Sequence, residues 1–355
     1  MPDPFEKYSK KDKDYFKFNK ELFKNKTEEP IIKFDHENWE DILKRVEKKG
    51  QGRGAGDPRI EAVRQSVLIE SKPDTKFSDI VGQEEAVRQS QELCEQVAHP
   101  EVFEAYGVEA PKGILFYGPP GTGKTTLARA IASESDSVFM VVKSSDVMNM
   151  WVGESEKTVQ ALFGLASLEH EESGRRVLIY LDEVESLLPK EGDRTPDYIR
   201  RIRSEFLQQM EGFSSNPNIT IIASTNNPDL ITPAFLSRMQ RWVEVGLPSP
   251  DGRIDLFNYY LSKKLRTVSE KRGINLDTQV DFGHVAEITE GMSGRDIRDI
   301  VNLLFAGLAF AEISGQQVEN ITTEGLEQVI NANKKVINDR TETAKRPMGF
   351  NNRKY

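Results

Sequence analysis

One eight-residue stretch limits what this chain can fold into more than any other feature of its sequence. Residues 118–125 read Gly-Pro-Pro-Gly-Thr-Gly-Lys-Thr, which fits the pattern G-x-x-x-x-G-K-[ST]. The stretch directly follows an apolar run, Gly113–Tyr117, and it opens a helical pattern at Thr126–Ser133. Glycines let backbone N–H groups turn toward phosphate oxygens, and a helix N-terminus adds positive potential. Strand, loop and helix together predict a phosphate-binding loop.

The loop is typical of P-loop ATPases and predicts ATP and Mg²⁺ as cofactors. We expect the Lys124 ammonium to neutralise the β- and γ-phosphates, and the Thr125 hydroxyl to ligate Mg²⁺. The alternative interpretation is a glycine-rich turn with a structural role only. The expected cofactor-binding residues of this stretch are Gly118, Pro119, Pro120, Gly121, Thr122, Gly123, Lys124, Thr125 and Thr126.

Polar side chains follow two further apolar runs at the points where those runs end. Val177–Leu181 leads to Asp182 and Glu183, and Ile219–Ser224 leads, through one threonine, to Asn226. Adjacent residues at a strand end point in different directions, so the two carboxylates can take different roles. We expect Asp182 to hold Mg²⁺ through water, and Glu183 to polarise and orient the attacking water. An amide at Asn226 can bond the γ-phosphate or that water. The alternative for the two carboxylates is a solvated strand end, and for Asn226 it is a turn-forming asparagine.

Apolar strands alternate with amphipathic helices from about residue 77 to residue 248. In Ser155–Ser167, apolar residues recur at the spacing of one helix face. This alternation predicts an α/β fold, a parallel sheet with helices on both faces. The expected strands are Gly113–Tyr117, Val138–Val142, Val177–Leu181, Ile219–Ser224 and Trp242–Val245.

We expect the strands to stop after Pro248 and a small all-α lid domain to follow. Arg253–Leu265 and Arg295–Ile313 have helical patterns, and Ser293 suits the N-cap of the second. Upstream, alternating glycines interrupt regular structure, and a short helix is expected near Arg59–Ile69. The expected parts are a charged N-terminal arm (1–49), helical or partly disordered, a glycine-rich hinge and linker (50–76), the ATPase core (77–248), the helical lid (249–337) and a polar C-terminal tail (338–355).

The net charge and the amino-acid composition of the chain limit the kinds of molecule that it is expected to bind. The formal net charge of −9 and the pI of about 5.3 are opposite in sign to those of a general nucleic-acid binder. The arm interleaves lysines with aromatic residues, so a partner-docking or nucleic-acid-contacting role stays open beside the simpler one of a solvated arm. Cys94 is the only cysteine, which excludes an internal disulfide. No apolar run reaches bilayer length and no secretory signal is evident, so the expected location is cytoplasmic.

Taken together, these residues resemble the AAA ATPases over roughly residues 77–337. Pro111–Tyr117 leading into the loop is typical of that family, and Asn226 occupies its sensor-1 position. The resemblance implies that the backbone of one segment contacts the adenine, and that part of the lid flanks the base. The first segment is Asp79, Ile80, Val81 and Gly82, and the second contains Gly294 and Arg295.

The motif spelling resembles the branch of katanin, spastin, fidgetin and the ESCRT-disassembly ATPases, with some likeness to proteasomal and valosin-type ATPases. In this family, arginines placed like Arg238 and Arg241 reach the γ-phosphate of a neighbouring subunit. The loop containing Trp151, Val152 and Gly153 resembles the pore loop that grips an extended polypeptide. The alternatives are surface salt bridges for the arginines and a core tryptophan for Trp151.

The resemblance implies a homo-oligomeric ring, a hexamer in this family, that remodels, unfolds or disassembles protein substrates by pulling them through a central pore. A rival hypothesis is a nucleic-acid-associated loader or switch, and another is a catalytically silent scaffold. Three residues depart from the usual family spelling and leave the rate of hydrolysis and its coupling open: Glu211, Asn227 and Arg295.

Overall fold

The computed structural model describes residues 58–143, 155–190, 192, 195–212, 218–316 and 320–345. The expected N-terminal arm, the glycine-rich hinge up to residue 57, the loop with Trp151 and the end of the C-terminal tail lie outside these residues. Within the described residues, none of the helices is both long and apolar enough to cross a membrane.

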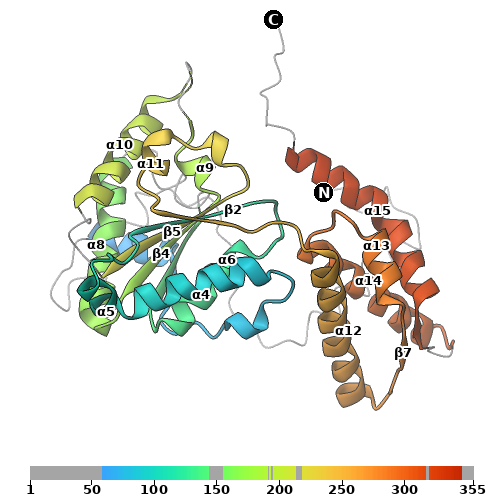
Figure 1. Ribbon diagram of the computed structural model, residues 1–355. Coiled ribbons are helices and arrows are strands. Elements are labelled where there is room, and N and C mark those ends of the chain that lie inside the picture. Colours follow the sequence, from blue (N-terminus) through green and yellow to red (C-terminus); the bar gives the residue numbers. More distant parts are fainter. Residues whose placement is uncertain are drawn as a thin grey trace, which may run out of the picture. The chain divides into compact units, whose positions relative to one another are not determined.

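A six-stranded sheet forms the centre of the ATPase core, in the order β1-β3-β4-β5-β2-β6 (Figure 1). The five strands from β2 to β6 pair in parallel, and only β1 at the edge is antiparallel to its neighbour. The expected α/β fold is therefore confirmed. The strands are β1 (Leu68–Glu70), β2 (Gly113–Tyr117), β3 (Val138–Lys143), β4 (Val177–Asp182), β5 (Ile219–Thr225) and β6 (Arg241–Glu244).

Both faces of the sheet are covered by helices, which explains why its inner strands are mostly apolar and are buried at almost every position. On one face α4 packs beside α6, and on the other α8 lies between α3 and α10. Successive side chains of a strand alternate between the faces, so Ile114 and Phe116 join the cluster under α4 and α6. The core helices are α3 (Pro58–Ser66), α4 (Glu84–Ala98), α5 (Pro100–Ala105), α6 (Lys124–Glu134), α8 (Ser155–Ser173), α9 (Val184–Leu187), α10 (Asp197–Gly212) and α11 (Pro233–Leu236), with 3₁₀ turns at Phe77–Asp79 and Pro228–Leu230.

Two details of the core differ from expectation. The helix expected to reach Ile69 ends at Ser66, because the chain turns there into edge strand β1. A bidentate ion pair between Glu70 of β1 and Arg129 of α6, with distances of 2.8 to 3.2 Å, attaches this strand to the core. Leu68–Glu70, expected in the hinge and linker, therefore belongs to the sheet.

The described residues of the helical lid form four helices around their own apolar cluster: α12 (Pro250–Arg272), α13 (Phe282–Ile288), α14 (Gly294–Ile313) and α15 (Thr323–Lys345). Ser293 is the N-cap of α14 and forms a capping box with Asp296, as expected. Buried Arg253 of α12 donates hydrogen bonds of 3.0 and 2.8 Å to the Ala286 carbonyl of α13. The expectation that strands stop after Pro248 is wrong, because β7 (Thr278–Gln279) and β8 (Ile321–Thr322) form a short parallel pair.

Replacing Phe206 with alanine should destabilise the core strongly. Its ring is fully buried between α8 and α11, with ring centroids 5.3 Å from Phe163 and 6.2 Å from Phe235. We expect Phe206→Ala to lower the free energy of unfolding by about 3–5 kcal/mol in urea denaturation followed by circular dichroism. The control Phe310→Ala removes a ring that is 58% exposed and should change it by less than about 0.5 kcal/mol. Equal losses in the two variants would contradict this packing.

Candidate functional site

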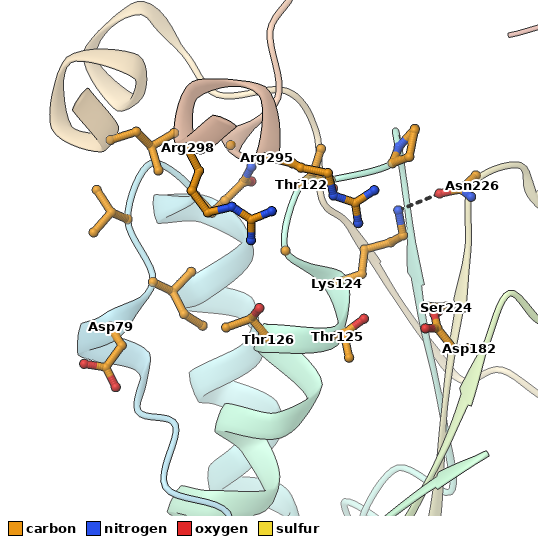
Figure 2. Close-up of a pocket in the computed structure, with 18 of the residues that line it drawn as sticks. Asp79, Thr122, Lys124, Thr125, Thr126, Asp182, Ser224, Asn226, Arg295 and Arg298 are labelled. Carbon is orange, nitrogen blue, oxygen red and sulfur yellow. Dashed lines mark hydrogen bonds between the residues drawn. The ribbon is translucent and has the colours of Figure 1, made fainter. Parts of the chain in front are cut away.

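A cavity of about 330 Å³ lies where the carboxyl ends of the parallel strands meet the lid, as expected for open α/β sheets (Figure 2). The core and the lid both line it, so the site is built from segments far apart in the sequence. Its predicted lining residues are Asp79, Ile80, Val81, Pro120, Gly121, Thr122, Gly123, Lys124, Thr125, Thr126, Asp182, Glu183, Asn226, Gly294 and Arg295. Three further predicted residues, Gly82, Gly118 and Pro119, belong to the same segments but do not line the cavity.

The loop between β2 and α6 can take its path only because two of its glycines lack side chains. A Cβ atom at Gly118, where φ is 140°, would lie 2.3 Å from the Val245 carbonyl oxygen. A Cβ atom at Gly121, where φ is 78°, would lie 2.8 Å from both the Ser293 hydroxyl and the Arg295 side chain. Gly118 therefore allows the loop to pass close to the backbone of Val245, and Gly121 allows the lid to pack against the loop.

The Lys124 ammonium lies buried at the centre of the site. It donates hydrogen bonds to the carbonyl oxygens of Gly118 (2.7 Å) and Pro119 (2.8 Å) and to Oδ1 of Asn226 (2.9 Å), the last drawn as a dashed line in Figure 2. Burial lowers the pKa of Lys124 from 10.5 to about 8, although the nearby carboxylates, Asp182 first among them, oppose this shift. With a pKa of about 8 the ammonium is still mostly protonated at neutral pH. A bound anion would replace the hydration that its burial removes.

Asp182 and Thr125 lie at one side of the cavity and are linked by other hydroxyl groups. The Ser224 hydroxyl donates to Oδ1 of Asp182 at 2.7 Å, and the Tyr180 hydroxyl donates to the same atom at 3.2 Å. The Thr125 and Tyr180 hydroxyl oxygens are 2.9 Å apart. A hydroxyl from α6 and a carboxylate from β4 are thus held close together in the lining of the cavity.

This donor set fits Mg²⁺. The ion prefers oxygen ligands, and it is usually held by one or two protein groups together with phosphate oxygens and water. Thr125 and Asp182 supply such groups next to the phosphate loop, so these two residues would hold the ion that the sequence implies.

Glu183 has a backbone conformation that is rare for a residue with a side chain. Its φ and ψ angles are 51° and 53°, in the left-handed region, and it is the N-cap of α9. This turn separates its side chain from that of Asp182, and both line the cavity. Strained residues of this kind cluster at functional sites, where the surrounding structure holds them in place.

Comparison with known proteins identifies the domain. Residues 114–247 match the sequence model of the ATPase family associated with various cellular activities (AAA). This chain contains an AAA ATPase domain. The chain is 37% identical over 241 residues to the proteasome-activating nucleotidase of Methanothermobacter thermautotrophicus, which covers 65% of this chain and 54% of that protein. It is 35% identical over 276 residues to the cell division cycle protein 48 homolog of Archaeoglobus fulgidus, which covers 76% of this chain and 33% of that protein.

The structure is also similar to that of the FIGL-1 AAA domain solved in complex with ADP. The TM-score is 0.62 and the identity 26%, covering 84% of this chain and 94% of that one. The chain spans about half the length of the proteasome-activating nucleotidases that it matches, at 54%, 59% and 53% of theirs.

Two predicted arginines of the AAA domain do not line this cavity. Arg241 begins β6 and pairs with Ile114, at the end of β2 opposite to the phosphate loop. Four strand residues at about 3.3 Å each separate these levels by about 13 Å. Arg238 precedes this strand, and its guanidinium bonds to the Ala234 carbonyl and to the Glu211 carboxylate of α10. Trp151, Val152 and Gly153 lie outside the described residues.

Several residues of the AAA site escaped the sequence analysis. Arg298 lines the cavity together with Arg295, and Figure 2 shows both side chains extending toward the phosphate loop. Their spacing of one helical turn, after the Ser293 cap, is the signal that could have found Arg298. Tyr180 lies two strand positions before Asp182, hence on the same face of β4. No sequence signal indicates Tyr259 and Tyr260, which reach the cavity from α12 through the fold of the lid.

ATP affinity should fall as the pH rises above 8. Below its pKa of about 8 in the free protein, Lys124 is protonated and binds phosphate without taking up a proton. Above that value binding requires proton uptake, so the affinity should fall by up to about tenfold per pH unit. Equilibrium titration with a fluorescent ATP analogue between pH 7 and 9.5 would measure this. In Lys124→Arg the guanidinium stays charged, and the decline should disappear even if overall binding is weaker. The same decline in both proteins would assign it to another group.

Proposed function

We propose that this chain is a Mg²⁺-dependent ATPase that converts ATP and water to ADP and phosphate. One observation carries the proposal: four side chains from α6, from β4 and the turn after it, and from the loop after β5 converge on one cavity at a helix N-terminus. They are Lys124, Asp182, Glu183 and Asn226. The ADP bound by the structurally similar FIGL-1 AAA domain supports a nucleotide as the ligand.

Each of these groups has a task that its chemistry suits. The N-terminus of α6 and the Lys124 ammonium bind the phosphates and stabilise the charge that shifts during transfer. Thr125 and Asp182 would hold Mg²⁺, which would supply further positive charge at the phosphates. The Glu183 carboxylate orients a water molecule and accepts a proton from it, and the Asn226 amide positions that water or the γ-phosphate. Arg295 and Arg298 place two further positive charges on the lid side of the cavity.

The active form contains several copies of the chain, arranged as a ring that we take to be a hexamer. Arg241 begins β6 and Arg238 precedes it, so both lie at the end of the parallel strands opposite to the cavity of their own chain. In the proposed ring they contact the nucleotide of a neighbouring copy, where a guanidinium stabilises the transition state. Arg238 would exchange its bond to Glu211 for the phosphate.

The ring uses ATP to remodel protein substrates, which are pulled as extended chains past Trp151 and its neighbours. Support comes from the relatives, since one is named for activating the proteasome and another is a cell division cycle protein 48 homolog. A flat aromatic side chain with one polar group suits gripping that tolerates many sequences. The rival role at nucleic acids depended on the lysine-rich arm, which lies outside the described residues.

Glu183→Gln should separate ATP binding from hydrolysis. The amide keeps the size of the side chain but is a far weaker base, so we expect turnover to fall by about 10²–10⁴-fold while ATP affinity is retained. Phosphate release and equilibrium binding measure the two quantities, and light scattering should show a longer-lived ring with ATP. Glu101→Gln on α5, outside the cavity, is the matched control and should behave like the wild type. Normal turnover in Glu183→Gln would remove this residue from catalysis.

Trp151→Ala should uncouple hydrolysis from work on a substrate. The variant should hydrolyse ATP normally but fail to unfold a fluorescent protein that carries an unstructured tail, measured as retained fluorescence. Tyr106→Ala removes an aromatic side chain that is 85% exposed and remote from the expected pore loop in sequence, and it should unfold this substrate as the wild type does. Unfolding by Trp151→Ala at the wild-type rate would exclude gripping by this residue.

A further inference from the structure

Tyr180 places a hydroxyl group among the residues of the metal site. Its side chain is fully buried, and its ring packs on Phe139 with centroids 5.6 Å apart. Packing alone would be served as well by phenylalanine, which buries no polar atom. The hydroxyl oxygen lies 2.9 Å from the Thr125 hydroxyl of α6 and 3.2 Å from Oδ1 of Asp182, at the end of its own strand.

The direction of these hydrogen bonds follows from the carboxylate. An ionised carboxylate only accepts, so the single proton of the Tyr180 hydroxyl is donated to Asp182. The Tyr180 oxygen is then an acceptor for Thr125, whose own proton points toward the tyrosine. Lone pairs of the Thr125 oxygen are thereby turned away from Tyr180, which is the orientation that a cation requires of a hydroxyl ligand.

The same network fixes the carboxylate. Oδ1 of Asp182 accepts from Tyr180 and also, at 2.7 Å, from Ser224 of β5. Two hydroxyls on neighbouring strands therefore determine the rotation of this carboxylate. Tyr180 bonds to both expected ligands, which belong to different elements.

We propose that Tyr180 is a positioning residue whose hydroxyl, supported at Asp182 by Ser224, sets the placement of Thr125 and Asp182 for Mg²⁺. The proposal rests on the function proposed above and assigns this residue no contact with nucleotide. Outer-shell partners of this kind orient metal ligands, and their removal typically weakens metal affinity by about 10–100-fold.

Tyr180→Phe tests the proposal because it removes one oxygen and keeps the ring. The measurement is equilibrium binding of a fluorescent, non-hydrolysable ATP analogue, first in EDTA and then at increasing Mg²⁺. We expect the Mg²⁺ concentration at half-maximal response to rise roughly tenfold, while affinity in EDTA stays at the wild-type value. The matched control is Tyr106→Phe, a tyrosine that is 85% exposed and outside the cavity, which should leave both quantities unchanged.

Other results would overturn the proposal. An unchanged Mg²⁺ midpoint, or an equal loss of affinity with and without Mg²⁺, would mean that the hydroxyl serves stability and not the metal site. If Tyr180→Phe does not fold, Ser224→Ala tests the same carboxylate and should also raise the midpoint, and an unchanged midpoint there would overturn the proposal. A wild type that binds the analogue without any response to Mg²⁺ would instead refute the metal role in the proposed function, and the inference with it.

Discussion

The parallel pairing of β2 with β5 on one side and β6 on the other is the constraint on which the site depends. Tyr117 pairs with Thr225 in β5, so the phosphate loop and the Asn226 amide begin at the same level of the sheet. Because β6 pairs along the opposite edge of β2, Val245 lies against the first glycine of the loop. A shift of register by one residue would turn every side chain of β2 to the other face. Lys124 would then no longer meet Asn226.

The lid contacts the phosphate loop at Gly121. The Arg295 amide donates a hydrogen bond of 3.1 Å to the Gly121 carbonyl, so the N-terminus of α14 touches the loop that would hold phosphates. Two positively charged residues of the cavity, Arg295 and Arg298, belong to the lid, whereas Lys124 and Asp182 belong to the core. Phosphates bound in this cavity would therefore contact residues of both the core and the lid.

Sequence reasoning succeeded where the pattern is local. The strand before the phosphate loop was predicted at Gly113–Tyr117, and this prediction is confirmed. The apolar run begins at a glycine and ends at the loop, so the sequence itself marks where the strand starts and ends. The α14 cap at Ser293 followed from a short capping pattern. Edge strand β1 was missed, since its three residues become a strand only through pairing with β3. The left-handed backbone of Glu183 and the contact of Tyr180 with Thr125 depend on tertiary packing, which leaves no periodicity in the sequence.

In the proposed ring each site is completed by an arginine from another copy, and a mixture of two inactive variants tests this arrangement. Lys124→Ala should lack phosphate binding and Arg238→Ala should lack the group supplied to a neighbour, so each alone should show almost no ATPase activity. In a mixture, a Lys124→Ala chain still offers its Arg238 to the intact cavity of an Arg238→Ala chain. We expect the mixture to regain part of the wild-type ATPase rate, and we expect this regained rate to increase with total protein concentration. Two results together would contradict shared sites and the ring. The mixture would never be more active than the average of the two variants, and the wild-type protein would hydrolyse ATP at its full rate as a monomer.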